Sequence, residues 1–161
     1  MIKKNFFINS SFILLIFLLD RISKTYVIYL DKKLLGSEIF SSKYLNISLI
    51  WNEGIAFGLL SFNHGNLYNL LTILIAVIIL VICFMIYKSS AIKKYFLIFI
   101  VGGALGNIYD RIFFNAVPDF IDFHINGFHW FIFNVADIFI SLGVIFMIFI
   151  EIIDNNRKKE L

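Results

Sequence analysis

Four long apolar segments constrain this 161-residue chain more than any other feature of its sequence. They cover approximately residues 6–30, 67–87, 95–114 and 134–153. A helix needs about 20 residues to cross the hydrocarbon core of a bilayer, so each segment is long enough to span a membrane. Hydrophobic residues make up 60% of the chain, whereas soluble domains contain about 45–50%. We therefore predict a mainly α-helical integral membrane protein with four transmembrane helices in one domain that covers residues 1–161.

The basic residues outside these segments predict the orientation of the chain. Eight lie at the two chain ends or between the second and third segments: Lys3, Lys4, Lys88, Lys93, Lys94, Arg157, Lys158 and Lys159. Only three lie in the other two connections: Lys32, Lys33 and Lys43. Because basic loops remain in the cytoplasm, we expect both termini to be cytoplasmic. The basic residues form short clusters beside apolar runs, without a basic stripe interleaved with aromatics, so we expect no nucleic-acid partner.

Two features of the apolar segments exclude other classes of protein. The single cysteine, Cys83, lies within the second segment, so an internal disulfide is impossible and a catalytic thiolate is strongly disfavoured. Asp20 and Lys24 interrupt the first segment, and no convincing small-residue cleavage site follows it. We expect a retained helix there instead of a removed signal peptide.

The connection over residues 31–66 is too long for a simple turn. Apolar residues at Leu45, Ile47, Leu49 and Trp51 approximate the two-residue period of a strand. We expect a small extracytoplasmic β-sheet here, between the first and second transmembrane helices and near the outer membrane surface.

Several polar residues lie within or beside the apolar segments, where ionisable groups are costly and usually functional. Asp20 and Lys24 share one helical face at a spacing of four residues. Asn107 and Asp110 share a face at the end of the third segment, and the adjacent Arg111 is expected to keep Asp110 ionised. A helix-stabilising pair and a structural salt bridge are the alternative interpretations of these two groups.

Carboxylates without an adjacent basic residue occur just before and at the start of the fourth segment. Pro118 restricts the backbone beside Asp119 to a defined, non-helical conformation. Asn134 is a candidate helix cap, which places Asp137 in the first helical turn, and a purely structural cap is the alternative interpretation. Asp110, Asp119 and Asp137 are expected to converge at the outer interface, where crowding gives a base beside an acid, as amide hydrolysis requires.

Five motifs occur in order along the chain: DRISK, NEGIAF, GGALGNIYDR, VPDF and FNVAD. In type, order and rough spacing they resemble those of the lipoprotein signal peptidases, also called signal peptidase II. These are aspartic proteases of the bacterial inner membrane, and the resemblance covers nearly the whole chain. It implies cleavage of prolipoproteins just before a diacylglyceryl-modified cysteine, on the extracytoplasmic face.

The resemblance also implies roles for individual residues. The catalytic pair is Asp119 and Asp137. The supporting or substrate-binding positions are Asp20, Lys24, Asn52, Gly54, Asn107, Asp110, Arg111 and Asn134. Asp122 is interpreted as a bystander, although its spacing alone does not exclude it as a catalytic partner. Prolipoproteins and membrane lipids are the expected partners of a monomeric enzyme that needs no cofactor and no metal.

Three alternatives are less consistent with the sequence. A proton or ion transporter would place acids across the bilayer midplane, whereas these cluster at one interface. A metallohydrolase would use Asp119, Asp122, His124 and His129, but the two histidines lack the spacing of an H-E-x-x-H motif. A purely structural membrane protein would not require so many intramembrane polar groups.

Overall fold

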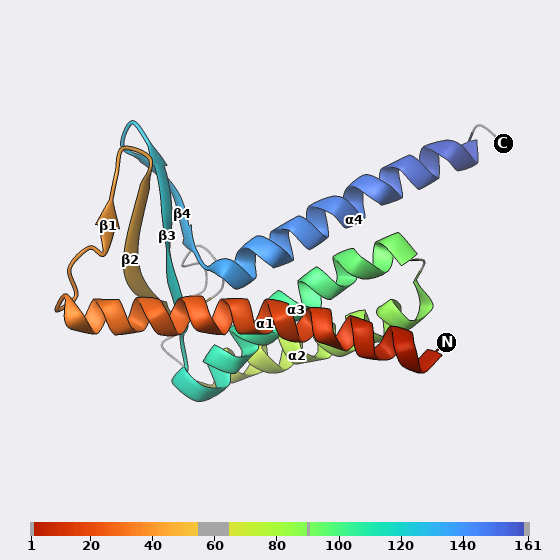
Figure 1. Ribbon diagram of the computed structural model, residues 1–161, viewed down its shortest axis with the longest axis horizontal. Helices are drawn as coiled ribbons and strands as arrows, with labels where there is room; N and C mark the ends of the chain where they lie inside the picture. Colours follow the sequence, from red (N-terminus) through yellow and green to blue (C-terminus); the bar gives the residue numbers. More distant parts are fainter. Residues whose placement is uncertain (1, 55–64, 90, 160–161) are drawn as a thin grey trace.

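The computed structural model describes residues 2–54, 65–89 and 91–159, which form four helices and one four-stranded sheet (Figure 1). In chain order, the elements are α1 (Ile2–Lys33), β1 (Phe40–Ser41), β2 (Leu45–Asn52), α2 (Gly65–Lys88), α3 (Ala91–Phe114), β3 (Val117–Ile125), β4 (Phe128–Phe133) and α4 (Val135–Lys159). Each helix contains a stretch that is long and apolar enough to cross a membrane. The predicted class of four transmembrane helices with a small sheet is therefore confirmed.

Helix α3 forms the centre of the helical part and contacts α1, α2 and α4. In its most apolar stretch 56% of the residues are buried, compared with 11% in each of the other three helices. Those three helices carry many exposed large apolar side chains, such as Phe7, Leu80 and Phe149. Such surfaces are stable only against lipid, because water would penalise so much exposed apolar area.

Two glycines of α3 allow the neighbouring helices to approach closely. A Cβ atom at Gly103 would lie 2.5 Å from the carbonyl oxygen of Ala136 and 2.9 Å from Cγ1 of Ile140, both on α4. A Cβ atom at Gly106 would overlap the carboxylate of Asp20 on α1. Small residues at helix contacts in membranes permit this kind of backbone approach. They bring the polar residues of α1 and α4 to the same part of α3.

The sheet is antiparallel, with the strand order β1-β2-β3-β4. The predicted strand beginning at Leu45 is confirmed as part of β2. The predicted location between helices one and two is correct only for β1 and β2, because β3 and β4 follow α3. Figure 1 shows the sheet at one end of the helices and both chain termini at the opposite end.

A two-residue turn joins β3 to β4. Asn126 and Gly127 form it, and both have positive φ values, 51° and 82°. Two successive residues with positive φ are typical of a type I′ turn, and Asn-Gly between apolar runs is a strong signal for a hairpin. The sequence prediction included no hairpin here, although this signal was present. The hairpin pairs the second half of β3 with β4, whereas Asp119 is paired with Ile50 of β2.

The contact at Gly103 provides a test of this packing. We expect Gly103→Ala to lower the free energy of unfolding by about 1–3 kcal/mol, because the added methyl group must displace α4. The measurement is the thermal unfolding of the purified chain in detergent. Leu80→Ala, at a side chain of α2 that is 69% exposed, is the control and is expected to change stability less. Equal or greater stability of Gly103→Ala would contradict the close approach of α3 and α4.

Candidate active site

Asp119 lies on β3, opposite Ile50 of β2, and only 4% of its surface is exposed. Its carboxylate accepts hydrogen bonds from two side-chain amides, Asn52 Nδ2 at 2.9 Å and Asn134 Nδ2 at 2.6 Å. Burial and then the negative charge of Asp137 raise the pKa of Asp119, the two amide hydrogen bonds oppose this shift, and the resulting pKa is about 6. Asp119 therefore exchanges a proton close to neutral pH.

Asp137 lies in the first turn of α4 and is half-buried. Its Oδ2 accepts a hydrogen bond from the backbone N–H of Asn134 at 3.1 Å, and its own N–H donates to Asn134 Oδ1 at 3.1 Å. This reciprocal pair is a capping box, which satisfies two backbone donors that a helix start leaves unpaired. The predicted cap is thus present, and it fixes the position of the Asp137 carboxylate.

Asn134 connects the two aspartates. It is fully buried between β4 and α4, and its side chain accepts from the N–H of Asp137 while it donates to Asp119. No ion pair within the described part of the chain involves Asp119 or Asp137, as expected from the absence of an adjacent basic residue. Both carboxylates are therefore held near each other by amides, without a cation in direct contact.

A buried cluster of charges lies behind this pair, between α1 and α3. The Nζ atom of Lys24 lies 2.9 Å from Asp20, 2.7 Å from Asp110 and 2.8 Å from Oδ1 of Asn107. Lys24, Asp20 and Asp110 are each 0% exposed. Arg21, which the sequence prediction did not include, pairs with Asp110 at 2.6 Å. The predicted pair of Asp20 and Lys24 exists, but it is one edge of a four-residue cluster.

Asn107 connects this charge cluster to Asp137 by hydrogen bonds. A lysine ammonium group can only donate, so the oxygen of the Asn107 amide must face Lys24. The amide nitrogen then faces the other way and donates to Asp137 Oδ1 at 2.8 Å. Asp20 makes a second connection, because its Oδ1 accepts from the backbone N–H of Ala136 at 3.0 Å. The charge cluster therefore fixes both the start of α4 and one oxygen of Asp137.

The predicted pairing of Asp110 with Arg111 is wrong. Asp110 pairs with Lys24 and Arg21 on α1. Successive residues of a helix point about 100° apart, so Arg111 faces a different neighbour. Its guanidinium donates to the backbone oxygens of Gly54 and Asn107, both at 3.3 Å.

The residues after β2 are positioned by local hydrogen bonds. The N–H of Gly54 donates to Oδ1 of Asn52 at 2.9 Å, which directs the Asn52 amide nitrogen to Asp119. Arg111 binds the carbonyl oxygen of the same glycine. Every predicted supporting residue thus connects to Asp119 or Asp137, either directly or through one or two other residues. Residues 55–57 of the NEGIAF motif lie outside the described residues.

Asp122 does not join this group, and its carboxylate contacts His129 Nδ1 at 2.8 Å. The network that binds Asp119 and Asp137 includes no contact with it.

A cavity of about 630 Å³ lies next to Asp137, between the β3–β4 hairpin and the start of α4. Its walls are almost entirely apolar and include Phe131, Phe133 and Leu142. An extended apolar ligand bound in this cavity would lie beside the Asp137 carboxylate.

Comparisons with known proteins agree with this architecture. The family model described as signal peptidase (SPase) II matches residues 12–153. The chain belongs to the signal peptidase II family. It is 51% identical to the lipoprotein signal peptidase of Pelagibacter ubique over 155 residues, which is 96% of this chain and 93% of that protein. It is 38% identical to the lipoprotein signal peptidase of Aquifex aeolicus over 149 residues, 91% and 87% of the two chains.

Solved structures support the same family fold. A bacterial membrane enzyme structure determined by the in meso method at 2.3 Å resolution matches with a TM-score of 0.80 and 27% identity, covering 95% of this chain and 92% of the other. A second such structure, at 1.9 Å resolution, matches with a TM-score of 0.73 and 28% identity over 89% and 91% of the two chains. Membership of a peptidase family favours the predicted protease over the transporter and the structural protein.

The charge cluster of this signal peptidase II family member can be tested by removing its central cation. We expect Lys24→Met to lower the free energy of unfolding by about 3–5 kcal/mol, because it leaves buried carboxylates without a partner. The measurement is unfolding of the purified chain in detergent. Lys93→Met is the matched control, since Lys93 also pairs with two carboxylates but at a partly exposed site, and it should change stability little. Similar losses in both variants would contradict a structural role for the buried cluster.

Proposed function

We propose that Asp119 and Asp137 are the catalytic pair of a membrane aspartic endopeptidase. Its substrates are prolipoproteins carrying a diacylglyceryl-modified cysteine, and it removes their signal peptide by cleaving before that cysteine. The observation that carries the assignment is the bridging of both carboxylates by Asn134, with no cation among the described residues paired to either one. A nearby cation would favour the ionised form of both groups, whereas the reaction needs one ionised and one protonated.

We assign the proton of the resting pair to Asp119. Asp119 is 4% exposed and its pKa is raised to about 6, chiefly by burial and then by the charge of Asp137. Asp137 is more exposed and borders the apolar cavity. The proton therefore belongs on the more buried carboxyl, where a charge is most costly.

The two carboxyl groups then divide the chemistry of hydrolysis. The Asp137 carboxylate takes a proton from a water molecule, and the water oxygen forms a bond with the carbonyl carbon before the lipidated cysteine. Protonated Asp119 donates its proton to the carbonyl oxygen as the tetrahedral intermediate forms. When the C–N bond breaks, the proton on Asp137 passes to the leaving amine of the cysteine and Asp119 recovers the proton of the hydroxyl. The pair returns to its starting state.

The remaining predicted residues have positioning roles in this proposal. Asp20, Lys24 and Asp110 hold α4 and the Asn107 amide, which in turn orients Asp137. Asn52 orients Asp119, and Arg111 holds the backbone next to Asn52 through Gly54. These contacts fix the two carboxylates from independent elements, so little reorganisation is required when substrate binds.

The apolar cavity suits the lipid-modified part of the substrate. Its aromatic walls reach from the hairpin to Asp137, so acyl chains bound there would place the modified cysteine beside the pair.

The chain acts as a monomer in contact with membrane lipids. Its location is the bacterial inner membrane, with both termini cytoplasmic and the sheet on the extracytoplasmic side. The support for this orientation is the distribution of basic residues and the position of both termini opposite the sheet (Figure 1).

Replacing either catalytic carboxylate tests the function. We expect Asp119→Asn and Asp137→Asn each to reduce cleavage of a diacylglyceryl-modified prolipoprotein by at least 1,000-fold, an estimate of roughly the size seen when an essential acid–base group is removed. The measurement is the mobility shift of the substrate in gels, with folding checked by thermal unfolding.

Asp122→Asn is the matched control, since it also removes a buried carboxylate from β3. We expect its activity to fall less than tenfold, because removing a nearby carboxylate that takes no part in proton transfer costs far less than removing a catalytic acid or base. Near-normal cleavage by either variant of the pair, or complete loss in Asp122→Asn, would contradict the assignment.

The pH dependence of kcat/KM tests the proton assignment. Because protonated Asp119 is the acid, we expect kcat/KM to fall as the pH rises above about 6, the raised pKa of this carboxyl. The Asn52 amide stabilises the ionised form, so Asn52→Ala raises the pKa of Asp119 and moves this limb to higher pH. The measurement is the initial rate at low substrate concentration across pH. A limb that stays in place or moves to lower pH in Asn52→Ala would overturn the assignment.

A further inference from the structure

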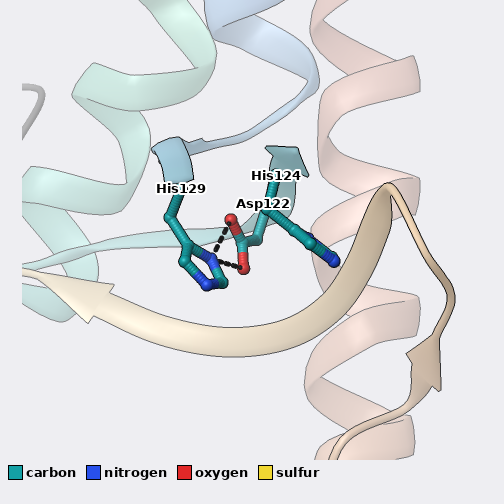
Figure 2. A group of neighbouring side chains, drawn as sticks. All are labelled: Asp122, His124 and His129. Carbon is teal, nitrogen blue, oxygen red and sulfur yellow. Dashed lines mark hydrogen bonds and ion pairs between the residues drawn. The ribbon is translucent and has the colours of Figure 1, made fainter. Parts of the chain in front are cut away.

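Two histidines and an aspartate converge on the β3–β4 hairpin, apart from the catalytic pair. His124 on β3 lies directly opposite His129 on β4 in the strand register, and Asp122 precedes His124 by two residues. Residues opposite each other and residues two apart on a strand project from the same face of a sheet. Figure 2 shows the Asp122 and His129 side chains facing each other, with His124 beside them.

We propose that Asp122, His124 and His129 bind one divalent transition-metal ion of the zinc class, which links β3 to β4. One donor atom from each residue lies within 4.8 Å of the other two. Zinc bonds to nitrogen and oxygen are about 2.0–2.2 Å long, which separates tetrahedral ligand atoms by about 3.3–3.5 Å. Nδ1 of His129 already lies 2.8 and 3.1 Å from the two Asp122 oxygens. Metal binding would move Asp122 and His129 slightly apart, from hydrogen-bond distance to the separation of co-ligands, and would turn His124 toward them.

The charge and hydrogen-bonding state of the three residues favours a cation. The side chain of Asp122 is 8% exposed, and no lysine or arginine among the described residues pairs with it. Nδ1 of His124 is buried and has no hydrogen-bond partner within the same part of the chain. Buried polar atoms usually have partners, so this nitrogen indicates a missing one. A bound metal ion would satisfy both groups at once.

The ligand set selects the class of metal. Two imidazoles and one carboxylate are typical of zinc and other borderline transition metals, whereas calcium and magnesium prefer oxygen ligands alone. The His129 side chain is 56% exposed, so an ion from solution can reach the site and water can fill a fourth position. The histidines were not expected to bind metal because their spacing lacks a helical motif. Pairing across two strands brings them together instead.

This metal site shares no ligand with the proposed catalytic pair, but it borders the same cavity. Asp122 contacts neither catalytic aspartate, whereas His124 lines the apolar cavity together with aromatic residues of the hairpin. A metal ion that joins β3 to β4 would stiffen that wall of the cavity. Binding of the ion does not depend on the proposed catalytic pair, whereas control of the substrate-binding surface by metal ions rests on the proposed function of the cavity.

The test uses the full chain in detergent, stripped with EDTA and then dialysed against Zn²⁺ or Co²⁺. We expect one ion per chain by elemental analysis, and a visible Co²⁺ spectrum with the intensity of a four-coordinate site. His124→Gln and His129→Gln should each weaken binding at least tenfold, and Zn²⁺ should raise the thermal unfolding midpoint of the unmodified chain but not that of these two variants. His64→Gln is the control for the third histidine, which lies outside the described residues.

Three results would overturn the site. The first is that neither ion binds at one per chain. The second is that His124→Gln and His129→Gln bind the ion with unchanged affinity. The third is that His64→Gln loses as much affinity for the ion as these two variants do. His129→Gln changes a side chain that is more than half exposed, so its fold should persist, and an unchanged unfolding midpoint without metal verifies this. If His124→Gln does not fold, Asp122→Asn replaces it as the second ligand variant, with the same expected loss of binding.

Discussion

The ammonium group of Lys24 lies within a transmembrane helix, surrounded by oxygen atoms of Asp20, Asp110 and Asn107. A charge at this depth is stable only with its partners in place, so this interaction determines how α1 and α3 meet. The arrangement extends to α4, because Asp20 binds the N–H of Ala136 and Asn107 binds Asp137. The position of one candidate catalytic group therefore depends on a cation that it does not touch.

The two candidate catalytic aspartates have a different electrostatic environment from the carboxylates of this cluster. Asp20 and Asp110 are paired with lysine and arginine, whereas Asp119 and Asp137 receive hydrogen bonds from amides and a backbone N–H. Amides fix a carboxylate in space with less bias toward its charged form than a cation would exert. This separation allows the cluster to stabilise the fold while the pair can hold a proton at pH values below about 6.

The sequence predicted much of this arrangement, since apolar length, basic residues, helical spacing and ordered motifs are all local signals. Spacing identified the Asp20–Lys24 pair and the cap formed by Asn134. It failed for Asp110, because partners on another helix are not visible in local spacing, and adjacent Arg111 was the wrong choice. The β3–β4 hairpin and the meeting of His124 with His129 depend on strand pairing, which the Asn126-Gly127 turn alone indicated.

The central claim is that the Asp119–Asp137 pair holds one proton at pH values below about 6. Infrared difference spectroscopy of the purified chain during pH titration measures it directly, through the carbonyl stretch of a protonated carboxyl group. The account predicts a carboxyl band that titrates with an apparent pKa close to 6 and disappears in Asp119→Asn. A pair with no band titrating near this pH, or a band that remains unchanged in Asp119→Asn, would contradict it.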